Sequence, residues 1–159
     1  MSHFTIHPIG VIHTPYKQKQ ELPIQGRFET EVVSYLEVKK IYQEGLLDLK
    51  DFSHAYLLFY FHQSKKVTMV GTPYLESIPH GIFAIRSPHR PNHIGLSLIK
   101  IKEIKENKVF FIGADMFDGT PLLDIKPYVP YFDHTENATA GWLEKHFKNG
   151  NIPTGISHK

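Results

Sequence analysis

The sequence of 159 residues contains no cysteine. Disulfide bonds, zinc sites built from thiolates and cysteine nucleophiles are therefore excluded. A metal ion would depend on histidines and carboxylates alone. His89 and His93 are four residues apart, but Pro91 between them prevents the pair from sharing one face of a helix, so we expect no metal site.

Long apolar runs are absent as well. Without a spanning stretch of roughly twenty apolar residues or an N-terminal signal pattern, we expect a soluble cytoplasmic protein with no membrane contact. The patterns G-x-G-x-x-G, G-x-x-x-x-G-K and H-E-x-x-H do not occur, which argues against a doubly wound nucleotide-binding fold. The formal net charge of +2 permits contact with nucleic acid without indicating it. The length fits one domain, residues 1–149, followed by a tail, residues 150–159.

Strand patterns are abundant and helix patterns are few. Short helices are expected at residues 39–50 and 139–148. Residues 55–61 are apolar throughout, and we expect this strand to be buried on both faces. Residues 106–108 suit a hairpin connection. The remaining expected strands are 9–12, 31–38, 67–70, 82–85, 96–104 and 109–114. Many short strands predict a mainly β protein, a barrel or a sandwich, and we favour a single antiparallel β-barrel with short flanking helices.

Arginine is scarce, with three residues against fifteen lysines, and two of the three lie in the segment 86–97. Arg86 and Arg90 offer planar guanidinium groups, which bind carboxylate or phosphate or stack on a purine. Pro88 and Pro91 stiffen the segment directly after an apolar run. We therefore predict a rigid ligand-binding loop. The alternative is that the two arginines pair with acidic neighbours such as Asp115 or Asp118.

A second polar segment runs from residue 115 to 128. Asp118-Gly119 is typical of a β-turn between two strands, and this is the simpler interpretation. Three aspartates within ten residues, Asp115, Asp118 and Asp124, also suit an amine, a ribose or a base edge. Because the segment contains no histidine, a cation is the less favoured ligand.

Two further segments are candidates on weaker grounds. Residues 14–29 are polar, rich in proline and contain the third arginine, but a solvent-facing loop explains them equally well. His62 and Gln63 follow the apolar strand, where they would either satisfy backbone groups at a barrel rim or bind a ligand.

Together these segments resemble the TrmO family, also known as YaeB or TsaA-like. The resemblance covers roughly residues 8–145 and rests on motifs that occur in the family's order: Ile9-Gly10-Val11-Ile12-His13-Thr14-Pro15-Tyr16, Pro23-Ile24-Gln25, Ser53-His54 with His62-Gln63, Arg86-Ser87-Pro88-His89-Arg90-Pro91-Asn92 with Ile94-Gly95-Leu96-Ser97, and Asp118-Gly119-Thr120-Pro121 with Leu123-Asp124-Ile125-Lys126-Pro127-Tyr128. Two positions depart from the family pattern, since His93 replaces the second proline of Pro-Asn-Pro and Ile85 replaces a threonine.

The resemblance implies an S-adenosylmethionine-dependent methyltransferase on a β-barrel, which methylates N6 of threonylcarbamoyladenosine beside the tRNA anticodon. It implies cofactor contacts from Pro23, Ile24, Gln25, His62, Gln63, Arg86, Leu96, Asp118, Gly119, Thr120 and Pro121. It also implies a homodimer with the cofactor site near the subunit interface.

The residues that resemble the family also suggest the chemistry. Proton removal from the poorly nucleophilic nitrogen calls for a base, for which the candidates are His89, Asp115 and Asp118. Arg90 and Asn92 suit the threonyl carboxylate or an anticodon phosphate. Many bacterial members carry a further C-terminal domain, whereas this sequence ends soon after its second expected helix. Two alternatives therefore stay open: a non-catalytic module that binds S-adenosylmethionine or a nucleoside, and a methyltransferase acting on a small molecule.

Overall fold

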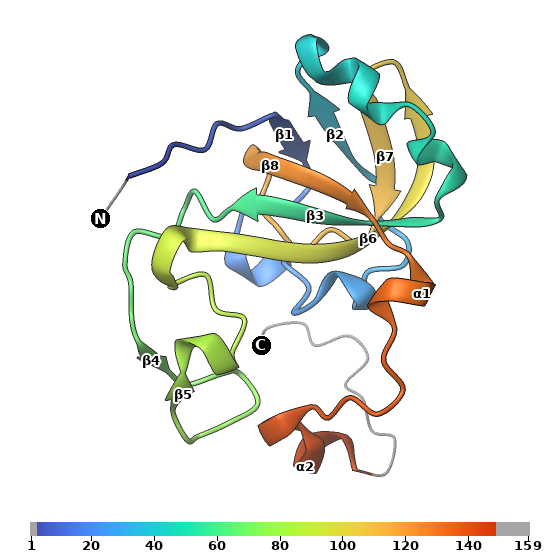
Figure 1. Cartoon of the computed structure of the whole chain (residues 1–159). Coiled ribbons are helices and arrows are strands. Elements are labelled where there is room, and N and C mark those ends of the chain that lie inside the picture. Colours follow the sequence, from blue (N-terminus) through green and yellow to red (C-terminus); the bar gives the residue numbers. More distant parts are fainter. Residues whose placement is uncertain (1–2, 149–159) are drawn as a thin grey trace.

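A closed antiparallel barrel of six strands forms the centre of the molecule in the computed structural model, which describes residues 3–148 (Figure 1). The strands are β1 (Gly10–His13), β2 (Ser34–Val38), β3 (His54–Tyr60), β6 (Ile94–Lys105), β7 (Lys108–Ile112) and β8 (Thr120–Pro127). Their order around the barrel is β1-β2-β7-β6-β3-β8, with β8 pairing back onto β1. The predicted antiparallel barrel is confirmed.

Alternation along each strand fills the barrel. Every second side chain points inward and is nearly inaccessible to water, as expected for a strand with one buried face. The inward residues that lie at 2% relative exposure or less include Ile12, Leu36, Val38, Leu57, Phe59, Ile99, Val109, Phe111 and Leu122. The prediction that residues 55–61 are buried on both faces was wrong: Ala55, Leu57 and Phe59 point inward, whereas Tyr60 is 38% exposed on the outside.

Short helices cover the ends of the barrel. The expected helix at 39–50 consists of two 3₁₀ helices, η3 (Lys40–Leu46) and η4 (Leu49–Asp51), because Asp48 between them adopts a left-handed conformation with φ of 62°. Residues 139–148 hold the 3₁₀ helix η7 (Gly141–Leu143) and one turn of α-helix, α2 (Glu144–Phe147). Four further short helices are η1 (Lys19–Glu21), η2 (Gly26–Phe28), η6 (Pro91–His93) and α1 (Pro130–Asp133).

The excursion between β3 and β6 differs most from the expected pattern. The strand predicted at 82–85 is a 3₁₀ turn, η5 (Ile82–Ala84), in which Ile82 is buried and Phe83 is 73% exposed. A short apolar run does not by itself distinguish a strand from a turn that buries its first and last residues, here Ile82 and Ile85. The strand expected at 67–70 is reduced to β4 (Val70–Gly71), paired with β5 (His80–Gly81) below the barrel (Figure 1).

Turns occur where the sequence predicts them. Residues 106 and 107 connect β6 to β7, with Lys105 opposite Lys108, and Glu106 takes a φ of 53°. Asp118 and Gly119 form a turn that leads into β8, and Gly119 has a φ of 77°, which favours glycine. The expected tail, residues 150–159, lies outside the described residues. Within residues 3–148, no helix is both long and apolar enough to span a membrane.

Antiparallel order brings the candidate segments to one end of the barrel. At that end β1, β3 and β7 finish, and β2, β6 and β8 begin. The connections that meet there are residues 14–33, 61–93 and 113–119. These three connections contain every site residue predicted from the sequence apart from Leu96, Thr120 and Pro121. Those three lie among the first residues of β6 and β8.

Candidate functional site

Two of the predicted loops are joined by one hydrogen bond. A guanidinium N–H of Arg86 donates to Oε1 of Gln25, at 2.9 Å, and the amide of Gln25 donates to the Ile24 carbonyl, at 2.8 Å. Arg86 is exposed, so its other N–H groups face solvent. Pro23 and Ile24 are half-buried beside Gln25. The structure thus brings together the segments 14–29 and 86–97, through two residues 61 positions apart.

Asp115 fastens the same loop to the barrel. One carboxylate oxygen accepts the Gly26 N–H at 3.0 Å, and the other accepts a short hydrogen bond from the Ser97 hydroxyl. Burial raises the pKa of the Asp115 carboxyl above its usual range, although these two hydrogen bonds and the charge of Arg86 act in the opposite direction. Both oxygens of this candidate base are therefore engaged in positioning the loop.

Glycine is required where the loop meets the barrel. A Cβ atom added to Gly26 would lie 1.9 Å from the Gly113 carbonyl oxygen, and Gly113 itself has a φ of 99°. Sequence analysis assigned no role to Gly26, Gly113 or Ser97. For Ser97 a signal existed, because this hydroxyl occupies an inward position of a strand otherwise filled by apolar groups.

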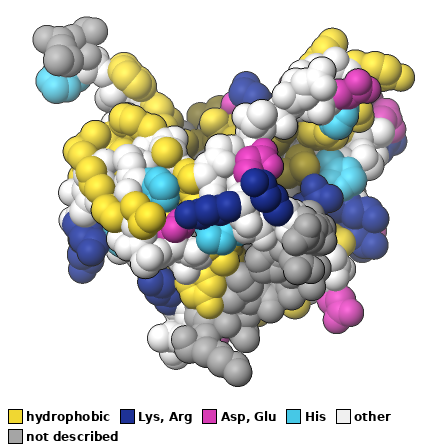
Figure 2. Space-filling view, turned by 90° about the horizontal axis from the view of Figure 1, so that it is seen from below, with side chains coloured by type: hydrophobic (Ala, Val, Ile, Leu, Met, Phe, Trp, Pro, Cys, Tyr) yellow, Lys and Arg dark blue, Asp and Glu magenta, His cyan; other side chains and the backbone are white. Residues whose placement is uncertain are grey.

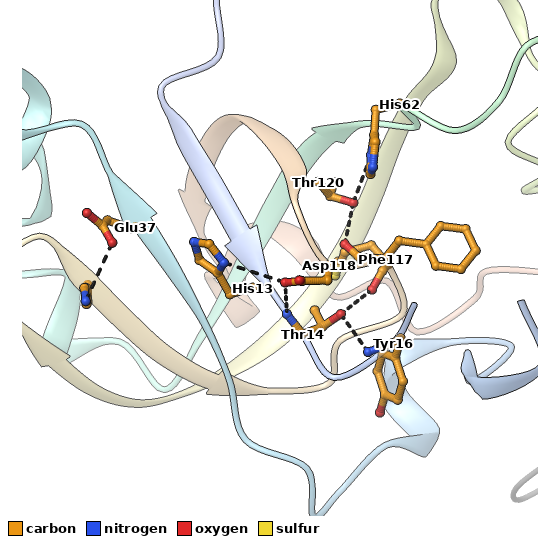
Figure 3. Close-up of polar contacts among 10 residues, drawn as sticks. His13, Thr14, Tyr16, Glu37, His62, Phe117, Asp118 and Thr120 are labelled. Carbon is orange, nitrogen blue, oxygen red and sulfur yellow. Dashed lines mark hydrogen bonds and ion pairs between the residues drawn. The ribbon is translucent and has the colours of Figure 1, made fainter. Parts of the chain in front are cut away.

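The Asp118-Gly119 turn is clasped to the end of β1 (Figure 3). The Asp118 carboxylate accepts the Thr14 N–H at 3.1 Å and lies 3.6 Å from Nδ1 of His13. Its own N–H donates to the Tyr16 carbonyl, and the Gly119 N–H donates to the Ile12 carbonyl, each at 2.9 Å. The turn therefore holds two chain segments about a hundred residues apart in register.

His62 approaches this turn from the end of β3. Its Nδ1 lies 3.4 Å from the Thr120 hydroxyl, which donates to the Phe117 carbonyl at 2.7 Å (Figure 3). Because the hydroxyl proton is committed to Phe117, His62 must be the donor in the longer contact. Gln63 is exposed beside it, and Pro121 pairs with Val11 in the β8–β1 ladder.

His89 lies within residues 86–97, called the arginine loop below, and is half-buried. Its Nδ1 is 2.8 Å from the Ser64 hydroxyl, and no contact of Nε2 is found in the part of the chain that the structure describes. Burial lowers the pKa of His89 below its usual value, and the positive charges of Lys66 and Lys19 lower it further. The imidazole is therefore neutral near pH 7 and able to accept a proton.

Arg90 and Asn92, two further predicted site residues of the arginine loop, differ in their hydrogen bonding. Arg90 donates to the Ile85 carbonyl at 3.0 Å and so braces the loop from within. Asn92 is exposed, with a φ of 62°, and His93 follows with a φ of 49°. Leu96, two residues into β6, points outward and is 55% exposed.

The helical segment formed by η7 and α2 contacts the residues that lead into the arginine loop. Nε1 of Trp142 donates to the Ala84 carbonyl at 2.8 Å, two residues before Arg86, and the indole stacks on His80 with ring centroids 4.7 Å apart. Glu76, which is almost fully buried, accepts bonds from Lys145 and His146. Sequence analysis gave Trp142 no functional role.

One surface of the molecule gathers charged and imidazole side chains. In the view from below, Lys and Arg, His and acidic groups adjoin across the middle of the face, beside hydrophobic side chains (Figure 2). Within residues 3–148 no group of three or more His, Asp or Glu side chains has the arrangement of a metal site. The site offers guanidinium, imidazole, carboxylate and apolar groups, which together suit a charged organic ligand.

Comparison with known proteins gives one consistent result. The model of the tRNA-methyltransferase O N-terminal domain family matches residues 11–134. A protein of Pyrococcus abyssi named as a probable S-adenosyl-L-methionine-binding protein is 46% identical over 138 residues, which cover 87% of this chain and 75% of that protein. The tRNA (adenine(37)-N6)-methyltransferase of Escherichia coli K12 is 36% identical over 154 residues, covering 91% of this chain and 66% of the relative.

The fold has a solved counterpart. The crystal structure of TrmO from Pseudomonas aeruginosa superposes with a TM-score of 0.75 at 35% sequence identity. The match covers 89% of this chain and 63% of the crystallised chain, so this chain spans less than two thirds of that protein.

Proposed function

The chain belongs to the tRNA-methyltransferase O N-terminal domain family, and we propose that it transfers a methyl group from S-adenosylmethionine to N6 of threonylcarbamoyladenosine in tRNA, beside the anticodon. The observation that carries this proposal is the convergence of the family's motifs at one barrel end, where Arg86 contacts Gln25 and the Asp118 turn is clasped to β1. The proposed location of the enzyme is the cytoplasm.

The residues at this end fit S-adenosylmethionine. Arg86 uses one N–H on Gln25 and keeps others exposed, which suits the carboxylate of the methionyl part. The exposed side chain of Leu96 offers an apolar contact for adenine. We assign the remaining cofactor contacts to Pro23, Ile24, His62, Gln63, Asp118, Gly119, Thr120 and Pro121.

Methyl transfer from a sulfonium is an in-line displacement in which the positive charge on sulfur disappears. The protein therefore contributes mainly by positioning the reactants and excluding water. When bound, the cofactor supplies an activated methyl group. Of the three candidate bases we favour His89, because it is neutral and its Nε2 has no contact within residues 3–148, whereas both oxygens of Asp115 accept hydrogen bonds and Asp118 holds Thr14.

Substrate recognition is assigned to the arginine loop. We propose that Arg90 and Asn92 bind the threonyl carboxylate, which is the charged group that distinguishes this modified base from ordinary adenosine. Arg90 already donates one N–H to Ile85, so the remaining edge of its guanidinium is held in a fixed orientation.

A homodimer is supported by the outer face of β3 and β6. Tyr56 lies opposite Leu98 and Leu58 lies opposite Leu96 in the ladder, so apolar side chains cover neighbouring positions on the outside of the barrel. Leu96, Leu98 and Tyr60 are 55%, 40% and 38% exposed. An exposed apolar face of this kind is typical of a protein interface, and it includes a proposed cofactor contact, Leu96. Sedimentation at micromolar concentration should show a dimer; a single monomeric species would contradict this proposal.

The experiment that tests the function is incubation with labelled S-adenosylmethionine and bulk tRNA, followed by mass spectrometry of the nucleosides. Label in threonylcarbamoyladenosine is expected. In a parallel reaction, tRNA that lacks the threonylcarbamoyl group should stay unlabelled, because it offers no carboxylate to Arg90. Label in a small molecule alone, or cofactor binding with no transfer, would replace the proposal with one of the two alternatives given above.

A further inference from the structure

Three aromatic rings from neighbouring strands form a row on the outer face of the barrel. His13 of β1, Tyr35 of β2 and Phe110 of β7 are direct cross-strand neighbours. The His13 and Tyr35 rings stack with centroids 4.6 Å apart and planes within 21°, and the Tyr35 and Phe110 centroids are 5.7 Å apart. These three residues are called the aromatic row below. None of them lies in the barrel core.

The row begins at the candidate site. His13 is its first member, and Nδ1 of His13 lies 3.6 Å from the Asp118 carboxylate (Figure 3). The row then leads away from the site across β2 to β7. A ligand that reaches Asp118 with one part is therefore within reach of the aromatic row with the next.

Lysines line the row. Nζ of Lys108 lies 5.4 Å from the Tyr35 ring centroid, and Nζ of Lys105 lies 6.0 Å from that of Phe110. Lys108 also lies 3.6 Å from Glu37, and Lys105 lies 3.0 Å from Glu103. All four charged side chains are well exposed, so these ion pairs are weak and a phosphate group can replace the carboxylates.

We propose that the aromatic row, with Lys105 and Lys108, binds the RNA strand adjoining the methylated nucleotide. This rests on the proposed function, in which the substrate is tRNA. Unpaired loop nucleotides are recognised by stacking on aromatic side chains, while their phosphates contact cations. Aromatic rings flanked by ammonium groups offer both contacts, and a row that begins at His13, beside Asp118, orients the RNA strand toward the site.

The surface stays available in the proposed dimer. In the strand order β1-β2-β7-β6-β3-β8, β2 and β3 are separated by two strands on either side. The aromatic row is centred on β2, whereas the apolar face assigned to the dimer interface spans β3 and β6. The aromatic row is therefore separated from β3, and Lys105, which belongs to β6, lies at the opposite end of that strand from Leu96 and Leu98.

The test measures binding of a synthetic anticodon stem-loop RNA to the Tyr35→Leu and Phe110→Leu variants, by fluorescence anisotropy of a labelled RNA. Leucine keeps an apolar side chain but removes the π-face. Each substitution should weaken RNA binding roughly tenfold, as expected for the loss of one stacking contact. Affinity for S-adenosylmethionine, measured by calorimetry, should be unchanged. Tyr42→Leu is the control, because Tyr42 is an exposed tyrosine on η3, outside the aromatic row.

A second variant tests the charges in the opposite direction. Glu37→Gln frees Lys108 from its carboxylate, so RNA binding should become roughly two- to fivefold tighter at low salt and lose this gain at high salt. An effect that fails to depend on salt would contradict the assignment of Lys108 to a phosphate.

The outcomes separate this proposal from the proposed function. If the wild-type protein binds and methylates the RNA while Tyr35→Leu and Phe110→Leu behave like Tyr42→Leu, the aromatic row is not the RNA surface and the function stands. If the wild-type protein binds S-adenosylmethionine but no RNA, both proposals fall. Weaker RNA binding in the two variants with normal cofactor affinity supports both.

Discussion

The guanidinium of Arg86 donates a hydrogen bond to the side chain of Gln25, 61 residues earlier in the chain. The two side chains come from the two longest connections at this end of the barrel, so the bond ties together loops that no strand ladder connects. A ligand held between these loops would be contacted by both.

Replacing Arg86 is the most direct test of the cofactor site. Arg86→Ala should weaken binding of S-adenosylmethionine by about 1.5–3 kcal/mol, because a charge-assisted hydrogen bond to a carboxylate is lost. Isothermal titration calorimetry measures this directly. Arg27→Ala is the control, since Arg27 is an exposed arginine of η2, two residues after Gln25. Equal affinity in the two variants would defeat the assignment.

Gly26→Ala should disrupt the loop that carries Gln25. The new Cβ would lie 1.9 Å from the Gly113 carbonyl oxygen, so η2 must move away from the barrel and break the Asp115 contact. We expect a loss of about 1–3 kcal/mol in the free energy of unfolding, measured with urea, together with weaker cofactor binding. Gly45→Ala is the matched control, because nothing lies within 4 Å of the added atom, and its stability should change little. A stable Gly26→Ala variant with normal affinity would contradict the packing.

Asp115→Asn should change how stability depends on pH. Because the pKa of Asp115 is raised, the folded protein binds this proton more tightly than the unfolded chain does. Its stabilising contribution is therefore fully present below the unfolded pKa of about 3.9 and declines as the pH rises through the raised value. Asparagine does not titrate, so the stability of the variant relative to wild type should increase between about pH 4 and about pH 7.5. Urea unfolding at both pH values tests this; a constant difference would show that Asp115 does not titrate as stated.

The pH profile of methyl transfer tests His89. A base must be neutral to accept a proton, and the pKa of His89 lies below its usual value of about 6.5. The acidic fall in the rate should therefore have its midpoint below about pH 6.5. His89→Gln should lower kcat by about two orders of magnitude, remove this acidic fall and leave cofactor affinity intact. An unchanged kcat in His89→Gln would return the role of base to Asp118 or Asp115.

Arg90→Lys should separate turnover from cofactor binding. Lysine keeps the charge but loses the planar fork, so the orientation that the Ile85 carbonyl imposes on Arg90 is lost. We expect a lower rate on threonylcarbamoyl-modified tRNA with unchanged affinity for S-adenosylmethionine. Steady-state kinetics and calorimetry on the same preparation check the two expectations, and a parallel loss of both would place Arg90 in the cofactor site instead.

Much of the fold could be predicted because its signals are local. Alternating apolar and charged residues in β6, the hairpin at residues 106 and 107 and the Asp118-Gly119 turn all depend on neighbours a few positions away. The predictions failed where a short apolar run formed a turn, or had one of its faces outside the barrel, instead of forming a fully buried strand. Residues 82–85 bury two isoleucines through a 3₁₀ turn, and residues 55–61 have one apolar face outside the barrel.

The sequence by itself determined which residues are the candidates for the chemistry, because scarce arginines, paired prolines and an Asp-Gly turn stand out from their surroundings. Only the tertiary structure decided which of them meet. The Arg86–Gln25 bond, the hold of Asp115 on Gly26 and the clasp of Asp118 on Thr14 join residues 61, 89 and 104 positions apart. Such contacts exist because closing the barrel sets the register of every strand at once, and that global geometry leaves no trace in a local pattern.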